Sequence, residues 1–203
     1  MNLPNRLTAA RFVMALVFVA LMSFPSAVAY SGAYVVFIAA TITDYYDGKI
    51  ARDRNLITNF GKLLDPVADK VLLVSAFIMM MPDPYLHVPG WTVVVILARE
   101  FLVTGARSLA ASEGVVIAAN KWGKTKAVIQ MIYVFTFLFL ATAARALDDF
   151  GRLAERFPEG MTVVKRVIHG GSYWAILFVA LYTLYSGIQF ARINWKSLNI
   201  GNL

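Results

Sequence analysis

The chain alternates between long apolar stretches and short polar segments. Residues 12–43 carry no charged side chain. As one unbroken helix, this stretch would be about 48 Å long, well beyond the ~30 Å hydrocarbon core of a bilayer. Pro25 and Gly32 interrupt it near its middle, so it predicts two helices, at residues 7–24 and 28–47.

Four more apolar stretches follow, at residues 63–81, 91–111, 127–144 and 167–191. The first of them ends at Pro82, which cannot continue a helix. The pattern therefore predicts an all-α polytopic membrane protein: six transmembrane helices after a short N-terminal juxtamembrane segment, in a single domain covering residues 1–203.

A cleaved signal peptide is an alternative for the first stretch. Arg6 and Arg11 precede an apolar run that ends at Ala27-Val28-Ala29, a pattern typical of a cleavage site. The second apolar stretch follows at once, which favours two membrane helices.

Composition supports a membrane protein. Of the 203 residues, 59% are hydrophobic and 15% charged, and the mean hydropathy is +0.65. Soluble domains carry about 25% charged residues, and a chain this apolar would not stay disordered. The chain has no cysteine, which excludes disulfides and cysteine-based metal sites.

The basic residues predict the orientation. With both termini inside, twelve basic residues fall in internal segments and five in external ones, all five within residues 145–166. This asymmetry favours a cell (inner) membrane protein with both termini in the cytoplasm. Most of the basic residues that give the chain its net charge of +7 are then expected at the cytoplasmic face. Four acidic residues balance the five basic ones of residues 145–166, and an amphipathic surface helix is expected there.

Four aspartates stand beside or within the second and third apolar stretches, where a carboxylate is costly. Asp44 and Asp47 are spaced i, i+3, and Asp65 and Asp69 are spaced i, i+4, so each pair shares one helical face. Two antiparallel helices would direct all four carboxylates into one crevice at the cytoplasmic surface. Such a cluster of hard oxygen donors suits Mg²⁺ or Mn²⁺.

Small residues and an arginine accompany the aspartates. Gly48 and Gly61 allow a ligand to approach the backbone closely, and Ala51 leaves space on the same face. Arg52 offers a planar donor fork that suits phosphate. These residues and the metal ions together predict a diphosphate site.

Residues 44–69 carry a complete motif, D-x-x-D-G-x-x-A-R-x8-G-x-x-x-D-x-x-x-D. It resembles the signature of the CDP-alcohol phosphotransferases at all eight fixed positions and in the eight-residue gap. The six-span layout is also similar to that family and implies the CDP-alcohol phosphotransferase fold.

The resemblance implies roles for these residues. Asp44, Asp47, Asp65 and Asp69 would bind two Mg²⁺ or Mn²⁺ ions, and Asp69 would also be the general base. The implied contacts to the CDP-activated lipid are Gly48, Ala51, Arg52, Thr58 and Gly61, together with Asn5 and Thr8 near the N-terminus. Relatives are homodimers, and the resemblance carries that expectation over. As an alternative, the aspartates are solvated helix-end residues paired with Lys49, Arg52 and Lys70.

Shorter motifs concern the acceptor alcohol. Ala98-Arg99-Glu100, Thr104-Gly105-Ala106-Arg107 and Gly123-Lys124-Thr125-Lys126 resemble bacterial phosphatidylglycerophosphate synthases. This likeness implies transfer of a phosphatidyl group from CDP-diacylglycerol to sn-glycerol 3-phosphate, giving phosphatidylglycerophosphate and CMP. The expected ligands of the acceptor phosphate are Arg107, Lys124, Lys126 and Arg192. As an alternative, these basic residues are positive-inside anchors that contact lipid headgroups. Arg99 and Glu100 lie inside an apolar stretch and are expected to pair or to face the crevice.

Other functions remain open on the sequence. Inositol phosphate, serine or phosphatidylglycerol could replace glycerol 3-phosphate as the acceptor. A cation-coupled transporter would place carboxylates at the bilayer midplane and show an inverted repeat, whereas here the acids gather at one face. A non-catalytic membrane anchor would need no ordered aspartates. No feature indicates a nucleic-acid partner.

Overall fold

The computed structural model describes the backbone of residues 3–54, 59–118, 120–149 and 158–195, and the side chains of residues 9–43, 70–118, 120–149 and 158–195. Every regular element in these ranges is an α-helix. The helices are α1 (Leu3–Met22), α2 (Ala27–Arg54), α3 (Asn59–Met80), α4 (Gly90–Ser112), α5 (Lys121–Asp149) and α7 (Pro158–Asn194). They confirm the six predicted helical stretches and the all-α class.

Two differences from the prediction concern helix length. α2 continues past Asp47 to Arg54. α5 continues to Asp149 and α7 begins at Pro158, so both described ends of residues 145–166 extend the long helices. The prediction of a separate surface helix is wrong for residues 145–149 and 158–166, because they continue the hydrogen bonding of α5 and α7. Residues 150–157 lie outside the described residues.

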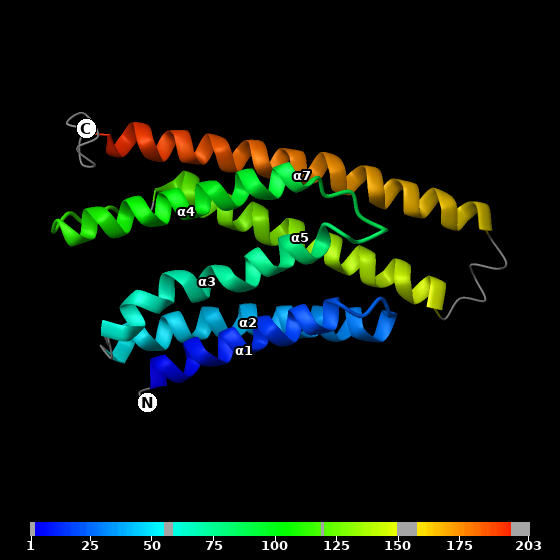
Figure 1. Ribbon diagram of the computed structural model, residues 1–203, viewed down its shortest axis with the longest axis horizontal. Coiled ribbons are helices and arrows are strands. Elements are labelled where there is room, and N and C mark those ends of the chain that lie inside the picture. The colour runs from blue at the N-terminus through cyan, green and yellow to red at the C-terminus, as the bar shows by residue number, and fades with distance from the viewer. Residues whose placement is uncertain (1–2, 55–58, 119, 150–157, 196–203) are drawn as a thin grey trace.

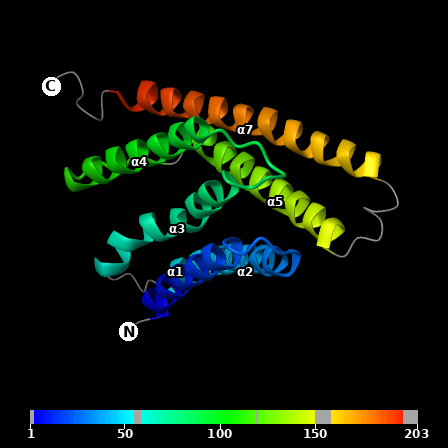
Figure 2. The ribbon, with the colours of Figure 1, turned by 45° about the vertical axis from the view of Figure 1, so that its right-hand side comes forward.

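The helices form an elongated bundle (Figure 1). α1 packs against α2 and α3, and α4 packs against α7. α5 contacts both α2 and α7, and in the second view it crosses between these two groups (Figure 2). The start of α1, the end of α2, the start of α3 and the end of α7 lie at the same end of the bundle (Figure 1). We call it the terminal end.

Local sequence sets the helix boundaries. Ser26 caps α2, since its Oγ accepts a hydrogen bond from the Ala29 N–H at 3.2 Å. At the end of α4, Gly114 has φ +79°, a left-handed conformation that favours glycine. Asn120 caps α5 by accepting a hydrogen bond from the Gly123 N–H at 2.9 Å. These short caps allow consecutive helices to reverse direction.

Aromatic side chains fill the core between the helices. The Phe37 ring of α2 lies 5.8 Å from Phe18 of α1 and 5.1 Å from Phe135 of α5, measured between centroids. Phe77 of α3 stacks on Tyr133 of α5 at 5.9 Å. These contacts tie the first three helices to α5.

The outer surface is also apolar. Leu16 is 68% exposed, Leu102 72% and Trp174 68%, on three different helices. Large apolar side chains spread over the outside of a bundle are typical of contact with lipid. Among the described residues, α5 and α7 are long and apolar enough to cross a membrane, and shorter apolar helical segments cover residues 9–22, 27–43 and 70–80.

A buried ionic cluster lies at the end of the bundle opposite the terminal end. Arg145 of α5 donates from Nη2 to Oδ2 of Asp83 at 2.7 Å, and the Asp83 side chain is fully buried. The guanidinium carbon of Arg145 lies 3.9 Å from the Tyr30 ring centroid and 4.9 Å from that of Tyr85. Tyr85 donates its hydroxyl hydrogen bond to Asp148, and burial together with that bond raises the pKa of Tyr85 to about 12. The cluster fixes the α3–α4 connection against α2 and α5.

Candidate active site

The four aspartates lie on two helices that are consecutive in the chain. Asp44 and Asp47 belong to the last turns of α2, and Asp65 and Asp69 belong to the first half of α3. α2 ends at residue 54 and α3 begins at residue 59, so the predicted i, i+3 and i, i+4 spacings both fall on helical backbone. Their side chains lie outside the described ones.

The donor set fits a divalent metal. Aspartates supply only oxygen ligands, and Mg²⁺ and Mn²⁺ prefer such ligands. The two aspartates of each pair occupy backbone positions about one helical turn apart, and only four residues separate the end of α2 from the start of α3. Backbone and donor chemistry are therefore compatible with the predicted metal centre.

The residues expected to hold the nucleotide fall at the same end. Gly48, Ala51 and Arg52 lie in the final turns of α2, and Gly61 lies in the first turn of α3. Asn5 and Thr8 lie in the first turns of α1, which packs against both helices at the terminal end (Figure 1); the side chains of these six residues lie outside the described ones. Thr58 lies outside the described residues.

One buried carboxylate joins three helices; we call Lys70, Arg99, Glu100, Thr104 and Lys126 the Glu100 cluster. Glu100 of α4 accepts from Lys126 of α5 through Oε1, and its Oε2 lies 3.4 Å from Nζ of Lys70 on α3. Nη1 of Arg99 lies 3.3 Å from Oε1. Lys70 also donates to the Thr104 hydroxyl and to the Glu100 carbonyl, the latter at 3.2 Å. The expected pairing of Arg99 with Glu100 is confirmed.

The Glu100 cluster also reaches α7. Arg99 donates from Nη2 to the Ser186 hydroxyl at 2.9 Å. The next residue on α7 is Gly187, where an added Cβ would stand 3.0 Å from Cγ of Arg99. Glycine at this position therefore lets the arginine side chain lie directly against the α7 backbone.

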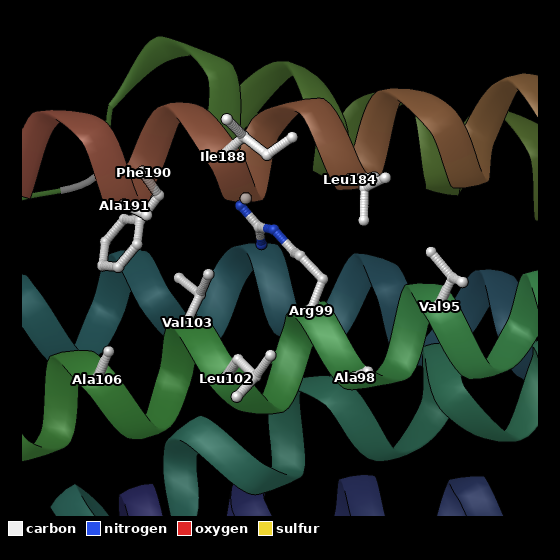
Figure 3. Close-up of a pocket in the computed structure, with 11 residues that line it drawn as sticks. Val95, Ala98, Arg99, Leu102, Val103, Ala106, Leu184, Ile188, Phe190 and Ala191 are labelled. Atoms are coloured by element: carbon white, nitrogen blue, oxygen red, sulfur yellow. The ribbon is translucent and has the colours of Figure 1, made fainter.

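A groove of about 520 Å³ runs between α4 and α7 beside Arg99 (Figure 3). Its walls are almost entirely apolar, from Val95 to Ala106 on α4 and from Leu184 to Ala191 on α7. Arg99 points from α4 towards α7 between these walls (Figure 3).

The four expected acceptor-phosphate residues differ in their surroundings. Lys124 and Arg192 are exposed, near the start of α5 and the end of α7. Arg107 is half-buried, and its guanidinium carbon lies 5.3 Å from the Phe190 ring centroid. Lys126 is buried, and its ammonium group is already paired with Glu100. Three of the four thus have an exposed or partly exposed side chain, and Lys126 belongs to the Glu100 cluster.

The sequence reasoning missed that Glu100 also binds Lys70 and Lys126. The sequence offers Lys70 only as a partner of the aspartates. All three residues are charged and stand in or beside apolar stretches, which was the available signal. The ion-pair partners of Glu100 depend on which helices pack together. The spacing of residues along one helix does not predict this packing.

Comparisons with known proteins agree with the motif. The family profile described as CDP-alcohol phosphatidyltransferase matches residues 1–155. A Bacillus subtilis protein named CDP-diacylglycerol–glycerol-3-phosphate 3-phosphatidyltransferase is 35% identical over 213 residues, covering 99% of each chain. A Rickettsia typhi protein of the same name is 39% identical over 166 residues, covering 80% of this chain and 92% of the relative. By the extent of these matches, the chain belongs to the CDP-alcohol phosphatidyltransferase family.

Proposed function

We propose that this protein transfers the phosphatidyl group of CDP-diacylglycerol to sn-glycerol 3-phosphate, giving phosphatidylglycerophosphate and CMP. The observation that carries the proposal is the relative of that name, which aligns with 99% of the chain. Family membership favours this enzyme over a transporter or an anchor. We further propose six membrane spans in the cell (inner) membrane, with both termini and the active site facing the cytoplasm, and a homodimeric assembly.

On the donor side, Asp44, Asp47, Asp65 and Asp69 are the proposed ligands of two Mg²⁺ or Mn²⁺ ions. When bound, these ions would neutralise the diphosphate and stabilise the charge that develops on the leaving CMP. Arg52 is proposed to bind a phosphate oxygen. The proposed backbone approach at Gly48 and Gly61 leaves room for the nucleotide.

Asp69 is the proposed general base. Its carboxylate accepts the proton of the acceptor hydroxyl, whose oxygen attacks the β-phosphorus of the donor. The bond from that phosphorus to the bridging oxygen breaks, and CMP leaves. A negatively charged acceptor needs cations close to the reacting phosphorus. The proposal assigns its phosphate to Arg107, Lys124 and Arg192, and ranks Lys126 after these three.

Purified protein with Mn²⁺ or Mg²⁺, CDP-diacylglycerol and a panel of alcohols tests the proposal through CMP release. The panel contains glycerol 3-phosphate, serine, inositol phosphate and phosphatidylglycerol. We expect strict dependence on glycerol 3-phosphate. Release of CMP with another alcohol only would refute the proposed acceptor and leave the proposed donor site in place.

The Asp69→Asn variant tests the base. Loss of a positioned proton acceptor lowers the rate by about 10²–10⁴-fold, so we expect the rate of CMP release to fall by at least about 10²-fold. Chelation with EDTA should abolish wild-type activity, and added Mn²⁺ should restore it. Normal turnover by folded Asp69→Asn protein would show that Asp69 is not the base.

A further inference from the structure

Glu100 is the one carboxylate in its cluster, and it faces three cations. Lys70, Arg99 and Lys126 all lie within 3.4 Å of its oxygens. The Glu100 side chain is 7% exposed. A buried carboxylate so surrounded is costly to remove, because its cations would then face one another without a counter-charge.

The partners come from three helices that have few other links. α4 packs mainly against α7, and its packing against α3 is slight. Lys70 bridges this weak junction with two hydrogen bonds, to the Glu100 carbonyl and the Thr104 hydroxyl, and with an ion pair to the Glu100 carboxylate. Lys126 makes the corresponding link from α5. Glu100 therefore holds α3, α4 and α5 together at this level of the bundle.

Each of these three helices carries a residue of the proposed site, and that residue lies within seven positions, along the chain, of a member of the Glu100 cluster. Lys70 directly follows Asp69 on α3. Arg107 lies seven residues, or two helical turns, after Glu100 on the same face of α4. Lys124 lies two residues before Lys126 on α5. A shift of one helix against another would separate the base from the acceptor's cations.

We propose that Glu100 is a positioning residue of the transfer reaction: through Lys70 and Lys126 it sets the spacing between the base on α3 and the acceptor-phosphate residues on α4 and α5. This inference rests on the proposed function. Glu100 touches neither substrate. It acts on where the acceptor binds relative to Asp69, and less on the binding of CDP-diacylglycerol.

The Glu100→Gln variant tests this role, since it keeps the shape and removes the charge. We expect KM for glycerol 3-phosphate to rise at least fivefold and kcat to fall about tenfold, with KM for CDP-diacylglycerol within twofold of wild type. Asp83→Asn is the matched control, because it also neutralises a buried carboxylate paired with an arginine, at the opposite end of the bundle. The control should lower thermal stability and leave both KM values unchanged.

Three further variants extend the test, and the first of them keeps it decisive if Glu100→Gln does not fold. Lys70→Gln removes a partner that is 27% exposed, and we expect a threefold or larger rise in KM for glycerol 3-phosphate. In the Lys126→Met background, Glu100→Gln should have a smaller effect than alone, because the two residues act as a pair. Glu100→Asp should recover part of the activity.

The proposal is overturned if Glu100→Gln and Lys70→Gln change only thermal stability, as Asp83→Asn does, or raise both KM values equally. Failure of the proposed function has a different signature. If wild-type protein uses another alcohol, the same variants are measured with that alcohol, and a selective rise in its KM still supports positioning by Glu100.

Discussion

The buried pair of Asp83 and Arg145 allows a quantitative prediction of stability. We consider Asp83→Asn, which leaves Arg145 inside the protein without its carboxylate. Removing one partner of a buried ion pair costs about 3–5 kcal/mol. Two features reduce that cost. Asparagine can still accept the hydrogen bond that the Tyr85 N–H donates to Oδ1 of Asp83 at 2.9 Å. Arg145 also keeps the ring of Tyr30 at 3.9 Å.

A desolvated cation over an aromatic ring retains about 2 kcal/mol, so we expect Asp83→Asn to lower the free energy of unfolding by about 1–3 kcal/mol. The measurement is unfolding in mixed micelles of a mild detergent and dodecyl sulfate, followed by circular dichroism. Lys165→Gln is the control: it removes a partly exposed pair with Asp148, 2.8 Å apart, and such pairs contribute about 0–1 kcal/mol.

The double variant Asp83→Asn/Arg145→Gln completes a cycle. Because the two groups form one pair, the double variant should lose less free energy of unfolding than the sum of the single variants. Additive losses, or a loss in Asp83→Asn no larger than in Lys165→Gln, would refute the reasoning that the pair is buried and coupled.

Two other predictions concern α7 and the acceptor site. Gly187→Ala would press a Cβ against Cγ of Arg99 at 3.0 Å and should lower the free energy of unfolding by about 1–3 kcal/mol; Gly171→Ala, whose Cβ meets its nearest neighbour at 3.9 Å, should be tolerated, and equal effects of the two would contradict the close approach. Neutralising both Arg107 and Lys124 with glutamine should raise KM for glycerol 3-phosphate more than tenfold while KM for CDP-diacylglycerol stays constant; an unchanged KM for glycerol 3-phosphate would refute their assignment to the acceptor phosphate.

The helices could be predicted closely because their signals are local. Pro25 and Pro82 mark boundaries in the sequence, and the structure ends α1 and α3 within three residues of them. The end of α5 was less predictable. The sequence predicts Arg145 in an external segment, and it does not predict that the charge is buried against Asp83, a partner 62 residues away.

The candidate site divides in the same way. The aspartate motif is local, since it lies on two consecutive helices, and spacing alone predicts which residues share a face. The proposed acceptor-phosphate residues lie on α4, α5 and α7, so whether they meet depends on helix packing. Lys124 and Lys126 look equivalent in the sequence. Only the structure shows that Lys126 is buried in an ion pair with Glu100 of α4.

The links of α4 have a consequence for biosynthesis. As one of the proposed spans, α4 would enter the bilayer carrying Arg99 and Glu100, with Lys70 the only cluster partner already made. Lys126 follows on α5, and Ser186 follows last, on α7. Charged groups in hydrocarbon are costly until they are paired. A chain that stops before α7 would therefore lack the Ser186 hydroxyl that Arg99 binds, and α4 would lack the helix against which it mainly packs.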